Sequence, residues 1–148
     1  MKRRRLYLLL LALAFVGIAI GWAARCGFGH RTPVPVLLAS GKFHQVAHRG
    51  RGRATIYQLP GGKRILSLTD FRTSVGQELQ VCLVAAADAF ENETVERAGF
   101  ISLGELQSAE GDQSYDLPVE VDLSIYKAVS IWSARYRVNF TTAPLTAP

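Results

Sequence analysis

Residues 53–68, RATIYQLPGGKRILSL, are the stretch that decides the fold. Two β-rich runs flank Pro60, Gly61 and Gly62, and glycine readily adopts the positive φ angles of tight turns. The stretch therefore predicts two β-strands joined as a hairpin. Alternating apolar and polar residues, bounded by turn residues, predict further strands at 77–86, 100–106, 113–117 and 128–140.

No run with a convincing helical period interrupts these strands. The acidic stretch AFENETVERAG, residues 89–99, is compatible with a helical turn or with an ordered loop. About 110 residues follow the N-terminal region, which is enough chain for one compact core. Many short strands in one domain predict an all-β fold, either an antiparallel β-sandwich or a β-barrel.

Residues 128–140, AVSIWSARYRVNF, place a small hydroxyl directly after a tryptophan. The alternation puts Trp132 and Tyr136 on the core face of a single predicted strand, and the opposite face changes from apolar to polar at Ser133. A nucleophilic serine needs a base and donors for an oxyanion, and no motif here supplies them. We therefore expect Ser133 to pack and to form hydrogen bonds rather than to react.

The first 24 residues combine a basic cluster, Lys2 to Arg5, with 19 uncharged residues from Leu6 to Ala24. A helix of that length spans about 28 Å, close to the thickness of the bilayer hydrocarbon. Residues 1–24 are therefore expected to form a signal-anchor transmembrane helix, with a cleaved signal peptide as the alternative. The basic flank should stay cytoplasmic, which places the remaining chain in the periplasm or at the cell surface. Residues 25–40, with their glycines and prolines, are expected to be a linker.

The net charge of +5 does not indicate nucleic-acid binding. Six of the 17 basic residues belong to the N-terminal region, which leaves 11 basic against 12 acidic residues from position 32 onward. The predicted domain is therefore close to neutral. Its basic residues gather early, in HRGRGR at residues 48–53, and such a cluster is either a solvated face or a site for an anionic ligand.

Motifs of common reaction chemistry are missing from the sequence, including GxSxG, HExxH, CxxC and the phosphate loop. His44 and His48 would project to the same side of an extended strand, a weak indication of a metal site that competes with a structural role. Cys26 lies in the expected linker, and a disulfide between it and Cys82 is not implied. Cys82 is expected to be a small packed side chain, with a redox thiol as the alternative. The sequence assigns no metal ligand set and no cofactor.

Several short motifs follow one another along the domain: GKF at 41–43, ATIY at 54–57, LSLTDF at 66–71, LGEL at 103–106, GDQSYDLP at 111–118, SIW at 130–132 and NFTTAPL at 139–145. On these motifs, residues 41–145 resemble the DM-thirteen domain, an electron-transfer domain often found beside DOMON modules. The resemblance implies a cysteine directly after the strand tryptophan, as a free redox thiol or as a ligand of a prosthetic group. In this sequence that position is Ser133. His48 and Trp132 are candidate ligands or structural residues.

The change from cysteine to serine is chemically large. A thiolate transfers electrons and ligates soft metals, whereas a serine hydroxyl near neutral pH does neither. We therefore expect a non-catalytic β-sandwich that is anchored in the membrane and binds an envelope or cell-surface partner. The alternative, implied by the resemblance, is a redox or electron-transfer accessory domain that uses Cys82 or a bound group.

Overall fold

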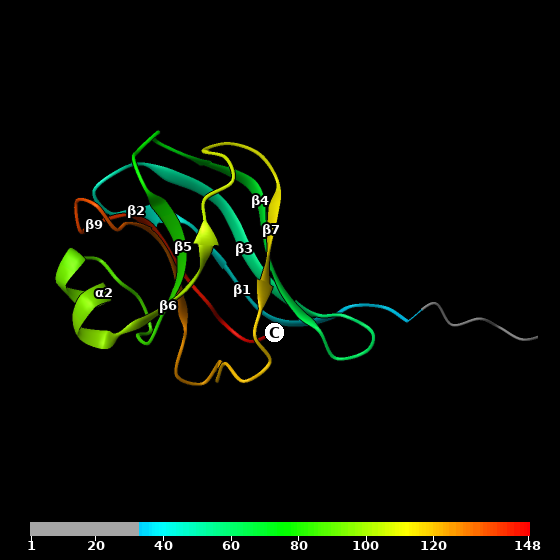
Figure 1. Ribbon diagram of the computed structural model, residues 1–148. Coiled ribbons are helices and arrows are strands. Elements are labelled where there is room, and N and C mark those ends of the chain that lie inside the picture. Colours follow the sequence, from blue (N-terminus) through cyan, green and yellow to red (C-terminus); the bar gives the residue numbers. More distant parts are fainter. Residues whose placement is uncertain (1–32) are drawn as a thin grey trace, which may run out of the picture. The chain divides into compact units, whose positions relative to one another are not determined.

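The computed structural model describes residues 33–148, which form a two-layer antiparallel β-sandwich (Figure 1). One sheet has four strands in the order β1-β3-β4-β7, and the other has five in the order β2-β9-β8-β5-β6. The four-stranded sheet contains β1 (Val36–Lys42), β3 (Gly50–Gln58), β4 (Arg64–Thr73) and β7 (Gln113–Leu117). The five-stranded sheet contains β2 (His44–Gln45), β9 (Val138–Pro144), β8 (Ala128–Ser133), β5 (Leu79–Val84) and β6 (Phe100–Glu105). The predicted all-β class is confirmed, and the sandwich is the alternative that forms.

The hairpin expected at residues 53–68 is present as β3 and β4. Its last strand pair joins Gln58 to Arg64, and Gly61 and Gly62 in the turn have φ angles of 93° and 92°. Those angles lie in the region that favours glycine, which is the physical basis of the sequence signal. The predicted strands at 77–86, 100–106 and 113–117 correspond to β5, β6 and β7. By contrast, β1 begins inside the stretch expected to be linker, because it pairs along most of β3.

The single strand predicted over residues 128–140 is wrong. The structure has two strands there, β8 and β9, joined by a turn at residues 134–137 in which Arg137 has a φ angle of 54°. Tyr136, expected in the core, lies in this turn and is 57% exposed. The alternation of apolar and polar residues continues through the turn, so periodicity alone could not separate a hairpin from one long strand.

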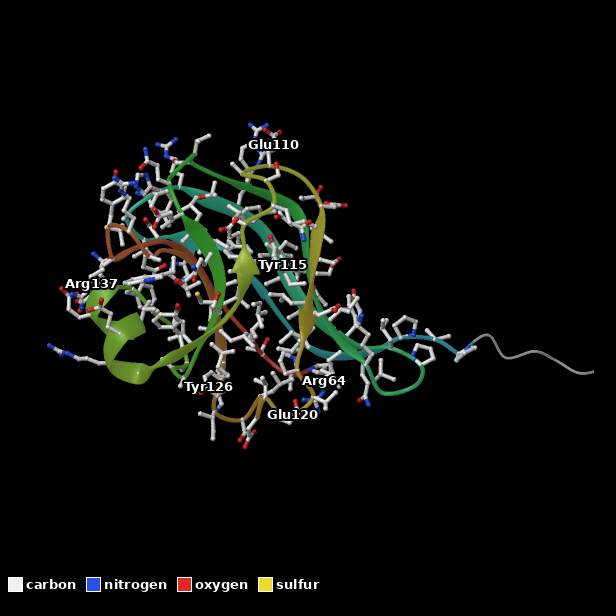
Figure 2. The ribbon with its side chains drawn as sticks, in the orientation of Figure 1. Arg64, Glu110, Tyr115, Glu120, Tyr126 and Arg137 are labelled. Atoms are coloured by element: carbon white, nitrogen blue, oxygen red, sulfur yellow. The ribbon has the colours of Figure 1, made fainter. Side chains whose placement is uncertain are left out.

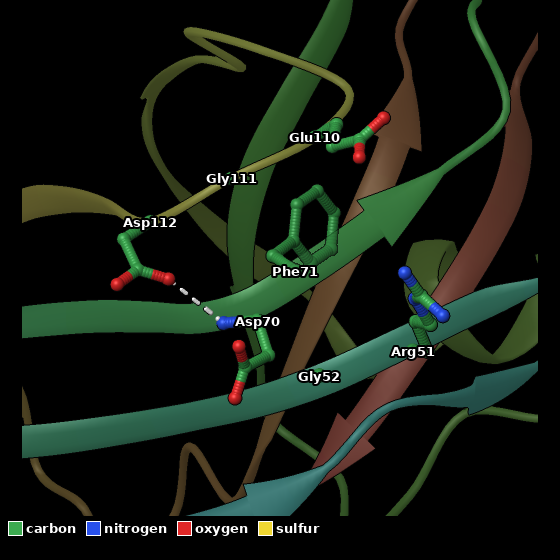
Figure 3. A pocket seen from close by; sticks show the side chains of 7 residues that line it. All are labelled: Arg51, Gly52, Asp70, Phe71, Glu110, Gly111 and Asp112. Carbon is green, nitrogen blue, oxygen red and sulfur yellow. Dashed lines mark hydrogen bonds between the residues drawn. The ribbon is translucent and has the colours of Figure 1, made fainter.

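A β-bulge interrupts the pairing of β3 and β4. On β4, Asp70 and Phe71 together oppose the single residue Gly52 on β3 (Figure 3). Asp70 has a φ angle of 49° and Gly52 one of 104°. A side chain on Gly52 would meet backbone atoms of β4 within 2.8 Å, so only glycine fits. The extra residue turns Phe71 into the core and returns Arg72 to the outer face of the sheet.

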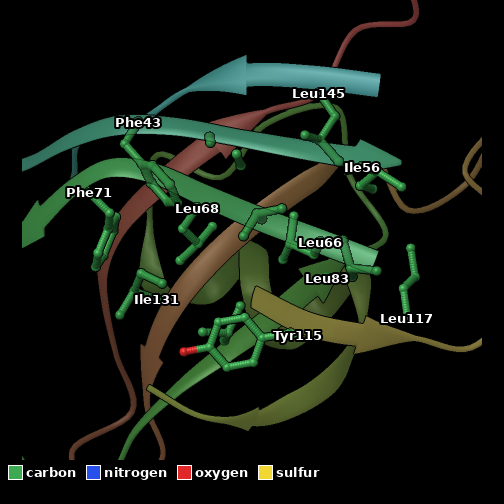
Figure 4. Close-up of a cluster of buried hydrophobic side chains, with 14 of the residues drawn as sticks. Phe43, Ile56, Leu66, Leu68, Phe71, Leu83, Tyr115, Leu117, Ile131 and Leu145 are labelled. Atoms are coloured by element: carbon green, nitrogen blue, oxygen red, sulfur yellow. The ribbon is translucent and has the colours of Figure 1, made fainter. Parts of the chain in front are cut away.

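Apolar side chains from both sheets fill the space between them (Figure 4). The rings of Phe43 and Phe71 meet edge to face there, with centroids 5.0 Å apart. Tyr115 points into this core, whereas Glu110 and Arg137 lie at the surface (Figure 2). The largest fully buried side chains include Ile56, Leu66, Leu68, Phe71, Leu83 and Ile131. This core fixes the inner face of the five-stranded sheet.

A second buried cluster covers the outer face of the five-stranded sheet, beneath the helix α2 (Asn92–Ala98). Val95 is the buried residue of the helix, and its partners in the cluster are Cys82, Val84, Ala89, Ala128 and Trp132. The stretch 89–99, which the sequence left open between helix and loop, therefore contains a helix of 7 residues. It forms because Val95 has an apolar surface to cover, and it ends at Gly99, whose φ angle is 84°.

Among residues 33–148, no helix is both long enough and apolar enough to span a membrane. The expected transmembrane segment at residues 1–24 and Cys26 lie outside the described residues, as does the first half of the expected linker. The anchor and its orientation therefore stay predictions.

Candidate functional site

Ser133 ends β8 and is fully buried. Its hydroxyl donates a hydrogen bond to the backbone carbonyl of Gln77 at 3.0 Å and accepts one from the N–H of Tyr136 at 3.4 Å. The N–H of Ala134 donates to the carbonyl of Glu78 at 3.2 Å beside it. These bonds attach the loop before β5 to the turn between β8 and β9, so the hydroxyl at this position is already engaged by the backbone.

Trp132 projects to the opposite face of β8 from Ser133, because successive side chains alternate across a strand. The indole is 3% exposed and belongs to the cluster beneath α2. Its ring centroid lies 6.0 Å from that of Phe100 on β6. The tryptophan therefore packs the outer face of the sheet, and the two residues of the Trp-Ser pair face different environments.

Cys82 is the free cysteine of the described residues and is fully buried. Burial away from water raises the pKa of its thiol to about 12, although a hydrogen bond with Ser102 acts in the opposite direction. On β5 it lies opposite Ser130, whereas Ser133 lies opposite Leu79. The two positions are thus three residues apart along the sheet, about 10 Å at roughly 3.3 Å per residue, and on opposite faces. The Cys82 thiol does not stand in for the cysteine that the resemblance implies at Ser133.

His44 and His48 do not share a site. The Nε2 atom of His44 lies 2.7 Å from Oδ1 of Asp88, and its ring stacks on Phe90. The ring of His48 instead packs on Phe140, with centroids 4.0 Å apart. Within residues 33–148, no group of three or more His, Cys, Asp or Glu side chains is placed to hold a metal ion. His48 has a packing role, and its backbone N–H donates to the carbonyl of Phe140 at 2.9 Å.

Sequence reasoning missed a buried polar network on the outer face of the five-stranded sheet. The Asn139 amide accepts from the Ser130 hydroxyl at 2.7 Å and donates to the Thr142 hydroxyl at 2.8 Å and the Ala89 carbonyl at 3.0 Å. All three side chains are fully buried. The sequence around Asn139 reads NFT, a pattern of surface glycosylation sites, so nothing in it marked the asparagine as a core residue.

The HRGRGR segment borders two clefts. A cleft of about 440 Å³ beside the bulge is lined by Arg51, Gly52, Asp70, Phe71, Glu110, Gly111 and Asp112 (Figure 3). In it, Oδ1 of Asp112 accepts a hydrogen bond from the N–H of Asp70 at 2.8 Å. A second groove, of about 360 Å³, is lined by Gln45, Arg49, Gly50, Arg51 and Arg72. Arg51 borders both, so the basic segment noted in the sequence forms one wall of a cationic groove.

The structure defines a class: an antiparallel β-sandwich in which a buried Trp-Ser pair ends a central strand and ties two loops together. A family model described as Electron transfer DM13 matches residues 42–145. This chain therefore belongs to the DM13 family, as the sequence motifs indicated. No curated protein and no solved structure matches the chain.

Proposed function

We propose that this chain is an extracytoplasmic binding module, tethered to the membrane by residues 6–24, that does not transfer electrons through a thiol. The observation that carries the proposal is Ser133, which is fully buried and donates its hydroxyl proton to the Gln77 carbonyl. A serine hydroxyl stays protonated near neutral pH and offers neither a redox couple nor a soft metal ligand. The chain forms a β-sandwich and carries a serine at the position where the resemblance implies a thiol.

Cys82, the cysteine that the described domain does contain, supports the same proposal. Cys82 is buried, and its raised pKa keeps it protonated at neutral pH. Reactive thiols need the thiolate form and access to a partner, and Cys82 has neither. Cys82 therefore acts as a small apolar side chain beneath α2.

A second candidate is electron transfer through a bound group, which the match to the Electron transfer DM13 model supports. The residues at the family position do not fit a ligated group, because Ser133 is a hard and protonated donor that already serves the backbone. His48 and Trp132, the other candidate ligands, pack against Phe140 and Phe100.

The full-length protein, purified in detergent, separates these candidates. We expect an absorption spectrum without visible bands, no uptake of electrons on titration with dithionite, and a Cys82 thiol that reacts with a disulfide reagent only after unfolding. A bound chromophore or reversible electron uptake by the wild-type protein would overturn the binding-module proposal.

The variants Ser133→Cys and Ser133→Ala sharpen this test as a matched pair. Both remove the hydroxyl, and only the first restores the residue of the family. A new reactive thiol or coloured group in Ser133→Cys alone supports loss of thiol chemistry at this one position. Loss of a redox activity in Ser133→Ala would show that the serine itself takes part in it.

The tether has its own test. Protease added to intact cells, or to spheroplasts if the domain is periplasmic, should remove residues 32–148, because the basic flank holds the N-terminus in the cytoplasm. Protection of the whole domain in spheroplasts as well, with digestion only after lysis, would contradict the proposed orientation.

A further inference from the structure

The groove lined by Gln45, Arg49, Gly50, Arg51 and Arg72 has an unbalanced positive charge. Arg72 forms a salt bridge with Glu110. Arg49 and Arg51 form none with any acidic residue in the part of the chain that the structure describes. Of the three guanidinium groups, one is therefore neutralised and two are not. A groove of this kind attracts anions and concentrates them at its walls.

The fold places the unbalanced charge of Arg51 beside a second arginine, Arg72, whose own charge is paired with Glu110. Arg51 on β3 is the direct cross-strand partner of Arg72 on β4, and like charges at such positions destabilise a sheet. The adjacent bulge fixes this arrangement, because the conformation of Gly52 excludes any side chain there. Ordinary sheet stability gives no reason for the arginine pair. Glu110 offsets the charge of Arg72, and an anion in the groove would offset that of Arg51 as well.

The wall of the groove that contains Gln45 and Arg49 is ordered by hydrogen bonds within the protein itself. The segment from His44 to Arg49 carries Gln45 and Arg49, and four hydrogen bonds hold it in place besides the pairing of β2 with β9. The Thr141 hydroxyl donates to the carbonyl of His44 at 2.5 Å, and the Thr73 hydroxyl donates to that of Arg49 at 3.3 Å. The N–H groups of Ala47 and His48 donate to the carbonyls of Asn139 and Phe140 at 3.1 and 2.9 Å. A wall that is already ordered loses little conformational entropy on binding.

The acidic residues nearby line the adjoining cleft and not the groove, and one of them, Glu110, is paired with Arg72. In the adjoining cleft, the side chains of Asp70 and Asp112 lie on the side away from Arg51 (Figure 3). Asp112 is engaged by the N–H of Asp70 and lines the cleft rather than the arginine groove. The Arg51 guanidinium therefore remains available on the groove side.

We propose that this groove binds a phosphoryl oxyanion. Planar guanidinium forks match the spacing of two phosphate oxygens, so arginine is the side chain best suited to such a group. Gln45 adds an amide that can donate to a third oxygen. The proposal rests on the binding function proposed above and names its ligand chemistry. The phosphoryl group is either that of a small free phosphate or one carried on a phosphate-rich polymer.

Calorimetric titration of the full-length protein in detergent tests the proposal, with inorganic phosphate and long-chain polyphosphate as the two probes. Binding of either probe supports a phosphoryl-binding site in the groove. Displacement of polyphosphate by millimolar inorganic phosphate assigns the site to a small anion, and tight binding of polyphosphate alone assigns it to a polymer. Failure of both probes to bind at low salt overturns the proposal.

Two double variants with the same change of net charge identify the site. Arg49→Gln with Arg51→Gln removes the unbalanced pair, whereas Arg97→Gln with Arg135→Gln removes two exposed charges elsewhere. We expect the first to weaken binding at least tenfold and the second less than twofold. Equal weakening by both would mean that net charge alone attracts the probe, and the groove proposal would fail.

A thermal unfolding scan shows whether an arginine substitution weakens binding by destabilising the fold or by changing the groove. The Arg51→Gln variant should unfold at the same temperature as the wild type or higher, because it removes a repulsive cross-strand pair. If neither phosphate probe binds, the proposed absence of thiol chemistry at Ser133 is unaffected, because thiol and redox measurements test it separately. Electron uptake by the wild type would remove the binding-module proposal without changing the phosphate titrations.

Discussion

The two faces of the five-stranded sheet are buried by different chemistry. The inner face meets the other sheet through apolar side chains such as Leu83 and Ile131. The outer face lies under the loop and helix of residues 85–99 and contains the hydrogen-bonded trio Ser130, Asn139 and Thr142. Apolar packing tolerates changes of similar volume, whereas a buried polar network fails when one member is lost. The outer face should therefore be the more specific and the more fragile of the two.

The largest effect is expected from Asn139→Ala. It leaves the hydroxyls of Ser130 and Thr142 and the carbonyl of Ala89 without their partner in a dry environment. We expect the free energy of unfolding to fall by about 3 kcal/mol or more, because each buried group left unpaired costs about 1 to 3 kcal/mol. Urea unfolding followed by tryptophan fluorescence measures the change.

The matched change on the inner face is Ile131→Val, which removes one methylene group from the core. It should lower the free energy of unfolding by only about 0.5 to 1.5 kcal/mol. If both variants lose the same stability, the contrast between the two faces does not hold.

The next effect concerns pH and belongs to the outer face. Burial raises the pKa of the Cys82 thiol from 9.0 to about 12, so the unfolded chain releases this proton at lower pH than the folded one. Stability should therefore be intact below about pH 9 and should fall as the pH rises toward 12. We expect the wild type to lose about 1 to 2 kcal/mol more than Cys82→Ala between about pH 8 and about pH 10.5.

Parallel urea titrations of the two proteins across that pH range isolate the thiol, because lysine and tyrosine ionisation affects both alike. Identical pH profiles would show that the Cys82 thiol ionises as easily in the folded protein as in the unfolded chain.

A smaller effect is expected from Ser133→Ala, at the end of β8 where the inner face meets solvent-exposed loops. The substitution removes the hydrogen bond to the carbonyl of Gln77, an exposed residue that water can reach. The loss should be about 1 kcal/mol and no more than about 2 kcal/mol. Thermal and urea unfolding give the value, and a loss as large as that of Asn139→Ala would make Ser133 part of an essential network.

The smallest effect is expected from Tyr136→Phe. The tyrosine is 57% exposed, and its hydroxyl lies 3.3 Å from the side-chain oxygen of Gln77. Removing a solvated hydroxyl should change the free energy of unfolding by less than about 0.5 kcal/mol. A change above about 1 kcal/mol in urea unfolding would indicate that the turn after β8 contributes to the core.

Much of the fold was predictable because its signals are local. The glycines at 61 and 62 and the alternating runs around them identify the β3–β4 hairpin without any knowledge of the rest of the chain. The same logic failed at residues 134–137, where Tyr136 and Arg137 continue the alternation inside a turn. A turn that lacks glycine and proline leaves no local signal in the sequence that marks the end of the strand.

The candidate sites were less predictable because they depend on register. The Ser133 position could be recognised from the motif around Trp132, and its hydrogen bond to Gln77 crosses 56 residues of sequence. The basic segment 48–53 was visible, but the pairing of Arg51 with Arg72 depends on a bulge on another strand. Long-range pairing of this kind follows from the completed fold and not from local pattern.

The edges of the sandwich limit how this protein can associate with copies of itself. Of the edge strands described, β2 has only two residues, and β6 has a register shift in its pairing with β5 and carries Gly104 at a φ angle of 129°. The edge strand β1 likewise has a register shift, between Leu37 and Ala39. Short or irregular edges are poor templates for strand addition, the route by which β-proteins form aggregates. Three of the four edges are thus protected from strand addition, and β7, whose five residues pair with β4 in regular register, is the edge at which a second copy could add a strand.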